Sequence, residues 1–244
     1  ARPMSRRNRQ PDPFDGILLV DKPTDWTSHD VVAKIRNQFK LNKVGHGGTL
    51  DPLATGLLVI LIGRATKASA TITNGDKTYT GTILLGRTTS TQDIQGETLT
   101  EADPAAITQD QITHALPALT GEIQQLPPMV SAIKKDGVPL YKLARKGVEI
   151  EREPRTCQIH RFDLTHFDNP HADIHVHCSK GTYVRTLAHD LGKNLGCGAC
   201  LSALRRTASG PLQIDQAHTL NQILSETRET LVNRTLPLET LLST

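Results

Sequence analysis

Short apolar runs and alternations divide this chain into segments of strand length. Residues 16–20 and 57–62 are uninterrupted apolar runs, a pattern typical of strands that are buried on both faces. Residues 77–85 alternate between threonines and larger or apolar side chains, which predicts a strand with one buried face. Residues 155–167 and 171–179 are expected to pair as two further strands, joined by an Asp-Asn-Pro turn.

A spacing of four residues marks the first helix. Val31, Ile35 and Phe39 recur at this interval, and Thr27 with Asp30 forms the pattern of an N-terminal capping box. Periodicity predicts four more helices, at residues 65–72, 107–119, 182–195 and 219–232.

The length and the termini set the broad class of the protein. A chain of 244 residues can bury a sizeable core. Its longest apolar run, at 57–62, is far shorter than the ~20 residues that span a bilayer. The basic N-terminus is not followed by the apolar segment of a signal peptide, so we expect a cytoplasmic protein. Residues 1–13 are rich in Arg and Pro and are expected to be disordered.

Charge is segregated along the chain. Four of the 28 Lys and Arg residues lie in the first ten positions, which leaves 24 basic residues against 25 acidic ones. Residues 88–131 contain six acids and no Lys or Arg, whereas residues 134–161 contain eight basic residues and four acids. This distribution fits a surface that meets phosphate on one side, although ordinary scatter over solvated faces explains it equally well.

Cysteine and histidine patterns give little support for a metal. Cys197 and Cys200 form a CxxC, but no second CxxC or paired His motif accompanies it. His171, His175 and His177 cluster, and His175 and His177 alternate with apolar residues, which places these two on the polar face of a strand. Metal binding by these histidines remains the less favoured alternative, and we expect no metal and no cofactor.

Asp51 lies in the most informative stretch of the chain, GHGGTLDPLATG at residues 45–56. Two readings are open from the residues alone. Asp before Pro is common turn chemistry. A carboxylate on a stiff loop beside a buried strand is also a plausible nucleophile or general base.

This stretch resembles, nearly letter for letter, the catalytic motif of the bacterial tRNA pseudouridine-55 synthases, the TruB family of pseudouridine synthases. The resemblance continues, in the family's order, over most of the chain from about residue 14 to residue 211. It includes GILLVDKP at 16–23, KTY at 77–79, PPMVSAIK at 127–134 and CSKGTYVR at 178–185. One departure is Ser90, where the family usually carries an Asp.

The resemblance implies a reaction and a set of site residues. The reaction isomerises uridine to pseudouridine at position 55 in the T-loop of tRNA, after the base is turned out of its stack, and needs no cofactor. Asp51 is the implied nucleophile, Tyr79 stacks on the uracil, and Arg185 is the cation partner of Asp51. The remaining implied substrate-binding residues are Lys22, His46, Asp93, Tyr183, Lys180, Lys134 and Arg205, with Arg206 as a further phosphate contact.

The resemblance also implies a fold and its partners. We expect an α+β fold with a central mixed, mostly antiparallel sheet flanked by helices. Residues 14–244 are expected to form the catalytic domain, with an inserted RNA-gripping arm at about 124–150 that carries a short helix near 143–145. The small C-terminal RNA-binding (PUA) domain of the family is expected to be absent. The expected partner is the tRNA T-arm stem-loop, bound by a monomer without an obligatory protein partner or a membrane.

Two rival functions stay open. A guide-RNA-dependent pseudouridylase shares the catalytic Asp but is expected to have protein partners and a longer C-terminal region. An RNA-binding or tRNA-folding protein without catalysis has no need for a nucleophile, so Asp51, Tyr79 and Arg185 argue against it.

Overall fold

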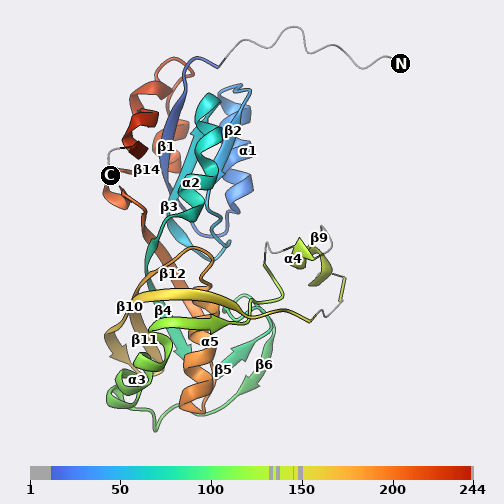
Figure 1. Cartoon of the computed structure of the whole chain (residues 1–244), viewed down its shortest axis with the longest axis vertical. Helices are drawn as coiled ribbons and strands as arrows, with labels where there is room; N and C mark the ends of the chain where they lie inside the picture. The colour runs from blue at the N-terminus through green and yellow to red at the C-terminus, as the bar shows by residue number, and fades with distance from the viewer. Residues whose placement is uncertain (1–11, 132–133, 136–137, 145, 148–150, 243–244) are drawn as a thin grey trace. The chain divides into compact units, whose positions relative to one another are not determined.

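The protein is described from a computed structural model that covers residues 12–131, 134–135, 138–144, 146–147 and 151–242. Two compact units are present (Figure 1). The first contains residues 1–75 and 206–244, and the second contains residues 76–205. Each is described by itself below. No helix in the described part of the chain is long and apolar enough to cross a membrane.

The first unit is built on two strands that are buried on both faces. These are β1 (Gly16–Lys22) and β3 (Thr55–Ile62), which pair antiparallel. Their apolar runs explain this position, because every side chain of such a run needs cover from water. Smaller strands extend the sheet: β2 (Val44–Gly47), β13 (Leu212–Gln213), β14 (His218–Thr219) and β15 (Thr235–Leu236).

Helices and helical turns complete the first unit. The helices are α1 (Ser28–Gln38), α2 (Ser69–Asn74) and α6 (Leu220–Leu224), and the 3-10 turns are η1 (Gly63–Ala68), η3 (Ile214–Gln216), η4 (Leu231–Arg234) and η5 (Leu238–Leu242). Helices α1 and α2 both pack on β2. The capping box predicted for α1 is confirmed, since Thr27 and Asp30 each bond to the other's backbone N–H.

The second unit is a sheet whose strands follow the order β12-β4-β11-β10-β7. Their bounds are β4 (Lys77–Leu85), β7 (Gly121–Gln125), β10 (Arg155–Asp168), β11 (His171–Cys178) and β12 (Ala199–Ser209), the last of which ends in the first unit. The pairs β4–β11, β10–β11 and β7–β10 are antiparallel, whereas β1 and β14 of the first unit pair in parallel. The predicted α+β class with mixed, mostly antiparallel strands is therefore confirmed.

Helix α5 (Val184–Leu195) is the longest helix of the second unit. It contacts α3 (Gln109–Ala115) and the 3-10 turn η2 (Leu116–Leu119), while α3 also contacts β10. The remaining elements among the described residues are two small hairpins and one short helix: β5 (Arg87–Thr89) with β6 (Thr98–Glu101), β8 (Lys134–Lys135) with β9 (Val138–Pro139), and α4 (Leu140–Ala144).

Three helix predictions need correction, and several strands were missed. The segments 65–72 and 107–119 are each divided between an α-helix and a 3-10 turn. The predicted helix 219–232 ends at Leu224, because Thr227 and Thr230 exchange side-chain and backbone hydrogen bonds that compete with the helical pattern. Strand β12 was not predicted, and neither were the shorter strands β2, β5, β6, β7, β13, β14 and β15.

The N-terminal tail and the inserted arm differ in detail from their predicted bounds. Of the tail predicted at residues 1–13, residues 1–11 lie outside the described part, while the carboxylate of Asp12 accepts N–H groups from Asn42 and Lys43. In the arm, the short helix begins at Leu140, three residues before its predicted position.

Candidate active site

The Asp51 turn joins β2 to β3 in the first unit. Gly48 and Gly56 flank it with φ values of 90° and 99°, which favour glycine because larger residues are strained there. Gly56 has a second constraint, since a Cβ at this position would lie 2.3 Å from the carbonyl oxygen of Arg206. The N–H of Ala54 donates to the carbonyl of Asp51 at 3.0 Å. This bond closes the turn, and Asp51 itself is half-buried.

The first residue of α1 braces this turn. Ser28 is 2% exposed, and its hydroxyl accepts the N–H of Leu50 at 2.8 Å while donating to the carbonyl of Leu50 at 3.1 Å. One side chain therefore satisfies both backbone groups of the residue that precedes Asp51. Because α1 is itself capped by Thr27, the position of the Asp51 turn depends on how this helix begins.

Lys22 braces the other side of the turn. This side chain is fully buried, and its ammonium donates to the carbonyls of Pro23 at 2.8 Å, Trp26 at 2.6 Å and Pro52 at 3.4 Å. Burial lowers the pKa of Lys22 to about 8, and the attraction of Asp25, Asp51 and Asp30 opposes that shift. The ammonium thus holds the backbone next to Asp51 and adds a positive charge to its surroundings.

Arg206 holds the turn from the end of β12. It is 1% exposed, and its guanidinium donates to the carbonyls of Leu57 at 2.8 Å, Gly48 at 3.0 Å and Thr49 at 3.3 Å. The prediction that Arg206 contacts phosphate is therefore wrong, because a buried guanidinium that bonds to three backbone carbonyls is not available to RNA. The structural role of Arg206 was missed because its partners lie 149 to 158 residues earlier in the sequence.

His46 lies on β2 in the same unit. Burial, followed by the nearby charge of Arg206, lowers the pKa of His46, so its imidazole is neutral at pH 7. The first unit therefore gathers three of the predicted site residues around one turn: Lys22, His46 and Asp51.

Arg185 is the second residue of α5 in the second unit. It is 3% exposed, its Nη1 donates to the carbonyl of Thr91 at 3.0 Å, and its Nη2 donates to that of Val130 at 2.9 Å. The guanidinium carbon lies 5.7 Å from the centre of the Tyr183 ring, within the range of a cation–π contact. The guanidinium is therefore held in a fixed orientation rather than free in solvent, which excludes the alternative of an exposed helix arginine.

Asp93 shapes the loop that presents Thr91. Its buried carboxylate accepts the hydroxyl of Thr91 at 2.7 Å and the N–H of Gln95 at 3.0 Å. The hydroxyl of Thr89 donates to its carbonyl. Asp93 therefore acts on this loop's conformation, and through the Thr91 carbonyl it helps to orient Arg185.

Gln125 is a functional candidate that sequence reasoning missed. It is 2% exposed, its amide oxygen accepts the N–H of Tyr183 at 3.0 Å, and its amide nitrogen donates to the carbonyl of Tyr183 at 3.1 Å. Tyr183 is the N-cap residue of α5 and has no side-chain cap of its own. Gln125 therefore holds the start of the helix that carries Arg185.

The other predicted residues lie on strands or at the surface of the second unit. Tyr79 is 8% exposed, and it pairs with Val176 in the β4–β11 ladder. Lys180 is exposed and Arg205 is half-buried. Lys134 lies in β8, but its side chain is outside the described part of the structure.

The cysteines of the CxxC do not form a disulfide. All four cysteines are free, and only Cys197 among them is not buried. Cys200 lies inside β12, and burial raises the pKa of its thiol, which makes it a poor metal ligand or nucleophile.

Comparisons with known proteins match nearly the whole chain. The model of the TruB family pseudouridylate synthase N-terminal domain matches residues 36–184, and that of the tRNA pseudouridylate synthase B C-terminal domain matches residues 185–243. A tRNA pseudouridine synthase B of Opitutus terrae is 54% identical over 86% of this chain and 87% of the relative. The corresponding protein of Syntrophotalea carbinolica is 50% identical over 86% of this chain and 69% of its own length.

Solved structures give a more distant match. A chain from a Cbf5-Nop10-Gar1 complex is 27% identical with a TM-score of 0.73, covering 96% of this chain and 68% of that chain. A chain from an H/ACA RNP bound to a substrate RNA is 26% identical with a TM-score of 0.70. This chain spans 60% of the length of that second structure.

Proposed function

The chain belongs to the TruB family of pseudouridylate synthases, and from this premise we propose that it isomerises uridine to pseudouridine in tRNA, at position 55 of the T-loop. Its identity to curated tRNA pseudouridine synthases is about twice its identity to the chains from H/ACA complexes. A tRNA substrate is therefore favoured over a guide-RNA-dependent activity. We further propose that the enzyme acts in the cytoplasm, as a monomer.

The bracing of the Asp51 turn is the observation that carries this proposal. Three buried side chains, Lys22, Ser28 and Arg206, bond to backbone groups on both sides of Asp51. Such support suits a nucleophile, which must be held close to its reactive geometry.

The reaction exchanges one bond to the ribose for another. The N1–C1′ bond of uridine breaks, the uracil turns, and C5 bonds to C1′. C5 then loses its proton to solvent, while N1 carries a proton in the product, so no oxidant or reductant is required. Asp51 is the proposed nucleophile that holds the intermediate during this rotation.

Tyr79 and Arg185 have proposed roles in the same reaction. Tyr79 stacks on the uracil after the base leaves its stack, which offsets part of the few kcal/mol that base flipping costs. Arg185 supplies the cation proposed to pair with the carboxylate of Asp51.

The other proposed contacts position the RNA. Lys180, Arg205 and Lys134 meet backbone phosphates of the T-arm, while Lys22, His46, Asp93 and Tyr183 support the site. Phosphate contacts carry no sequence information, so we expect them to set affinity and its dependence on salt rather than the choice of uridine. The proposed catalytic domain comprises residues 14–244, with the arm at about 124–150 contributing to the grip on RNA.

Release of tritium tests this function. Unmodified tRNA that carries C5-tritiated uridine is incubated with the wild-type chain, with Asp51→Asn and with Asp103→Asn, while tRNA binding is measured in parallel. Asp103 is a matched control because it also precedes a proline, in an exposed turn. We expect release by the wild type and by Asp103→Asn but none by Asp51→Asn. Binding of tRNA without any release by the wild type would instead identify a non-catalytic RNA-binding protein.

A further inference from the structure

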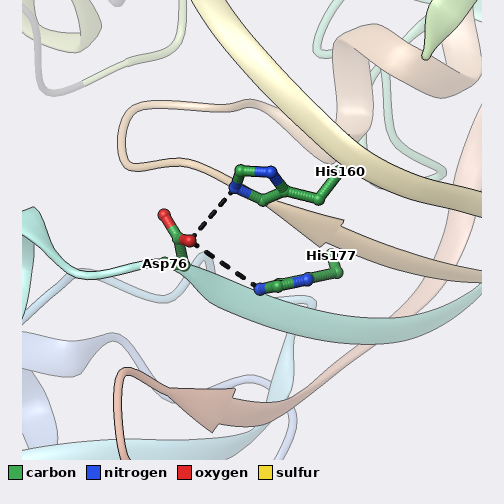
Figure 2. A group of neighbouring side chains, drawn as sticks. All are labelled: Asp76, His160 and His177. Atoms are coloured by element: carbon green, nitrogen blue, oxygen red, sulfur yellow. Dashed lines mark ion pairs between the residues drawn. The ribbon is translucent and has the colours of Figure 1, made fainter. Parts of the chain in front are cut away.

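Asp76, His160 and His177 form a cluster in the second unit that the reaction does not use (Figure 2). The Nε2 atom of His160 lies 3.0 Å from Oδ2 of Asp76, and the Nε2 atom of His177 lies 3.8 Å from the same oxygen. The centres of the two imidazole rings are 4.7 Å apart. Both rings therefore direct the same nitrogen toward one carboxylate oxygen.

The local structure of three strands creates this convergence. Asp76 immediately precedes β4, and His177 lies on β11 opposite Thr78 of β4. In the β10–β11 ladder, Ile159 pairs with Cys178 and Arg161 pairs with His177, so the register shifts at His160. Such an irregularity redirects a side chain relative to a regular strand. Figure 2 shows the His160 ring turned toward Asp76 as a result.

The spacing of the ligand atoms matches that of a metal site. A tetrahedral ion bound at about 2.0–2.1 Å holds its ligand atoms about 3.3 Å from one another. The measured separations of 3.0 and 3.8 Å lie on either side of this value, and all three ligand atoms are within 4.8 Å of one another. Small side-chain rotations therefore suffice to close the three atoms around one ion.

We propose that Asp76, His160 and His177 form a binding site for a divalent transition-metal ion, with Zn²⁺ as the reference case. Two imidazoles and one carboxylate favour Zn²⁺, Cu²⁺, Ni²⁺ or Co²⁺ over Mg²⁺ and Ca²⁺, which prefer oxygen ligands. Each imidazole ligates through an unprotonated Nε2 and keeps its proton on Nδ1.

The exposure of the cluster leaves room for further ligands. The side chains of His160, His177 and Asp76 are 37%, 43% and 48% exposed, so water or an anionic group can fill the remaining positions on the ion. The ion links the start of β4 to β10 and β11, and Tyr79 lies three residues after Asp76. The site is separate in its ligands from the proposed catalytic residues, so we expect metal to stabilise the second unit without being required for the reaction.

Calorimetric titration with Zn²⁺ tests the site, on a chain without a polyhistidine tag. All variants carry Cys197→Ser, because Cys197 is the one free thiol among the described cysteines that is not buried. Asp76→Asn, His160→Gln and His177→Gln are compared with His175→Gln as the matched control. His175 lies two residues before His177 on the same strand and is not part of the cluster.

One Zn²⁺ site per chain is expected in the parent, which carries Cys197→Ser alone, and in His175→Gln. Each cluster variant is expected to lose at least about tenfold in Zn²⁺ affinity. Zn²⁺ is also expected to raise the melting temperature of the parent but not that of Asp76→Asn, which retains the size of the side chain. Circular dichroism establishes that each variant is folded. The proposal is overturned if the parent does not bind Zn²⁺, or if His175→Gln loses affinity as much as the cluster variants do.

Discussion

Arg206 donates a hydrogen bond of 3.0 Å to the carbonyl of Gly48, a residue 158 positions earlier in the chain. With its bonds to Thr49 and Leu57, this contact connects the end of β12 to the turn that carries Asp51. The bonds are charge-assisted, and the bond to Leu57 is buried, where such bonds are strong. Arg206 is therefore best described as a positioning residue of the proposed nucleophile.

Replacing Arg206 by Lys tests this role. A lysine cannot reproduce the planar fork, so we expect about 2–4 kcal/mol less stability and a kcat lowered about ten- to hundredfold. The affinity for tRNA is expected to change little, because Arg206 is buried. Urea unfolding, single-turnover kinetics and tRNA binding measure the three quantities.

The adjacent Arg205 provides the control for that experiment. It is half-buried and a proposed phosphate contact, so Arg205→Gln is expected to weaken tRNA binding and to reduce its dependence on salt. Its effect on kcat is expected to be smaller than that of Arg206→Lys. If the two variants gave the same pattern, the assignment of distinct roles to these neighbours would be wrong.

Ser28 and Thr27 permit a similar comparison at the start of α1. Ser28→Ala leaves the N–H and the carbonyl of Leu50 without their buried partner, at an expected cost of about 2 kcal/mol. Thr27→Ala removes only the helix cap and is expected to cost about 1 kcal/mol. At a temperature where both variants are folded, kcat should fall more for Ser28→Ala than for Thr27→Ala, since Ser28 bonds directly to the residue before Asp51 whereas Thr27 acts only through the start of α1. Equal values of kcat would remove Ser28 from the support of the turn.

The titration of Lys22 makes the free energy of unfolding depend on pH in the alkaline range. Its pKa is about 8 in the folded chain, because of burial, against an ordinary value of 10.5. Between these values the unfolded chain keeps a proton that the folded chain has released, so stability rises with pH. This gain in stability is complete above about pH 10.5 and is lost as the pH falls to about 8.

Lys22→Met isolates this contribution. The free energy of unfolding of the wild type relative to the variant is expected to increase from about pH 7.5 to about pH 9.5. Urea unfolding of both chains at each pH measures the difference, and other groups that titrate in this range cancel between them. A difference that stays constant with pH would show that Lys22 keeps an ordinary pKa.

Local patterns in the sequence predicted the framework well. The capping box of Thr27 and Asp30 involves residues three apart, and the strand at 77–85 is recognised from its own alternation. Both depend on interactions within a few residues, so a single sequence contains the necessary information. Strand β12 was missed because Arg205 and Arg206 suggested a solvated, phosphate-binding surface, whereas Arg206 is buried.

The supports of the site were harder to predict because they depend on the tertiary fold. Arg206 reaches Gly48, and Gln125 reaches Tyr183, across 158 and 58 residues. In the predicted His171, His175 and His177 group, the fold instead brings His177 to Asp76 and His160. Strand register determines these neighbours, and no local periodicity encodes it.

Gln125→Leu tests the support of Arg185 in the second unit. Leucine has a similar size but cannot accept the N–H or donate to the carbonyl of Tyr183, so the N–H loses this partner while the carbonyl keeps the N–H groups of Thr186 and Leu187. We expect a loss of about 2–3 kcal/mol in the free energy of unfolding. Because Tyr183 is the N-cap of α5, the start of this helix loosens and the orientation of Arg185 becomes less defined.

Gln124→Ala is the matched control for Gln125→Leu, since Gln124 is the preceding residue of β7 and is exposed. Its side chain bonds only to the hydroxyl of Thr156 among the described contacts, so its removal should change stability by no more than about 0.5 kcal/mol. Hydrogen exchange of the first turn of α5 adds a local measurement, and it should accelerate in Gln125→Leu alone. If exchange in that turn were equal in both variants, the stability lost in Gln125→Leu would come from packing around the introduced leucine, and Gln125 would have no part in orienting Arg185.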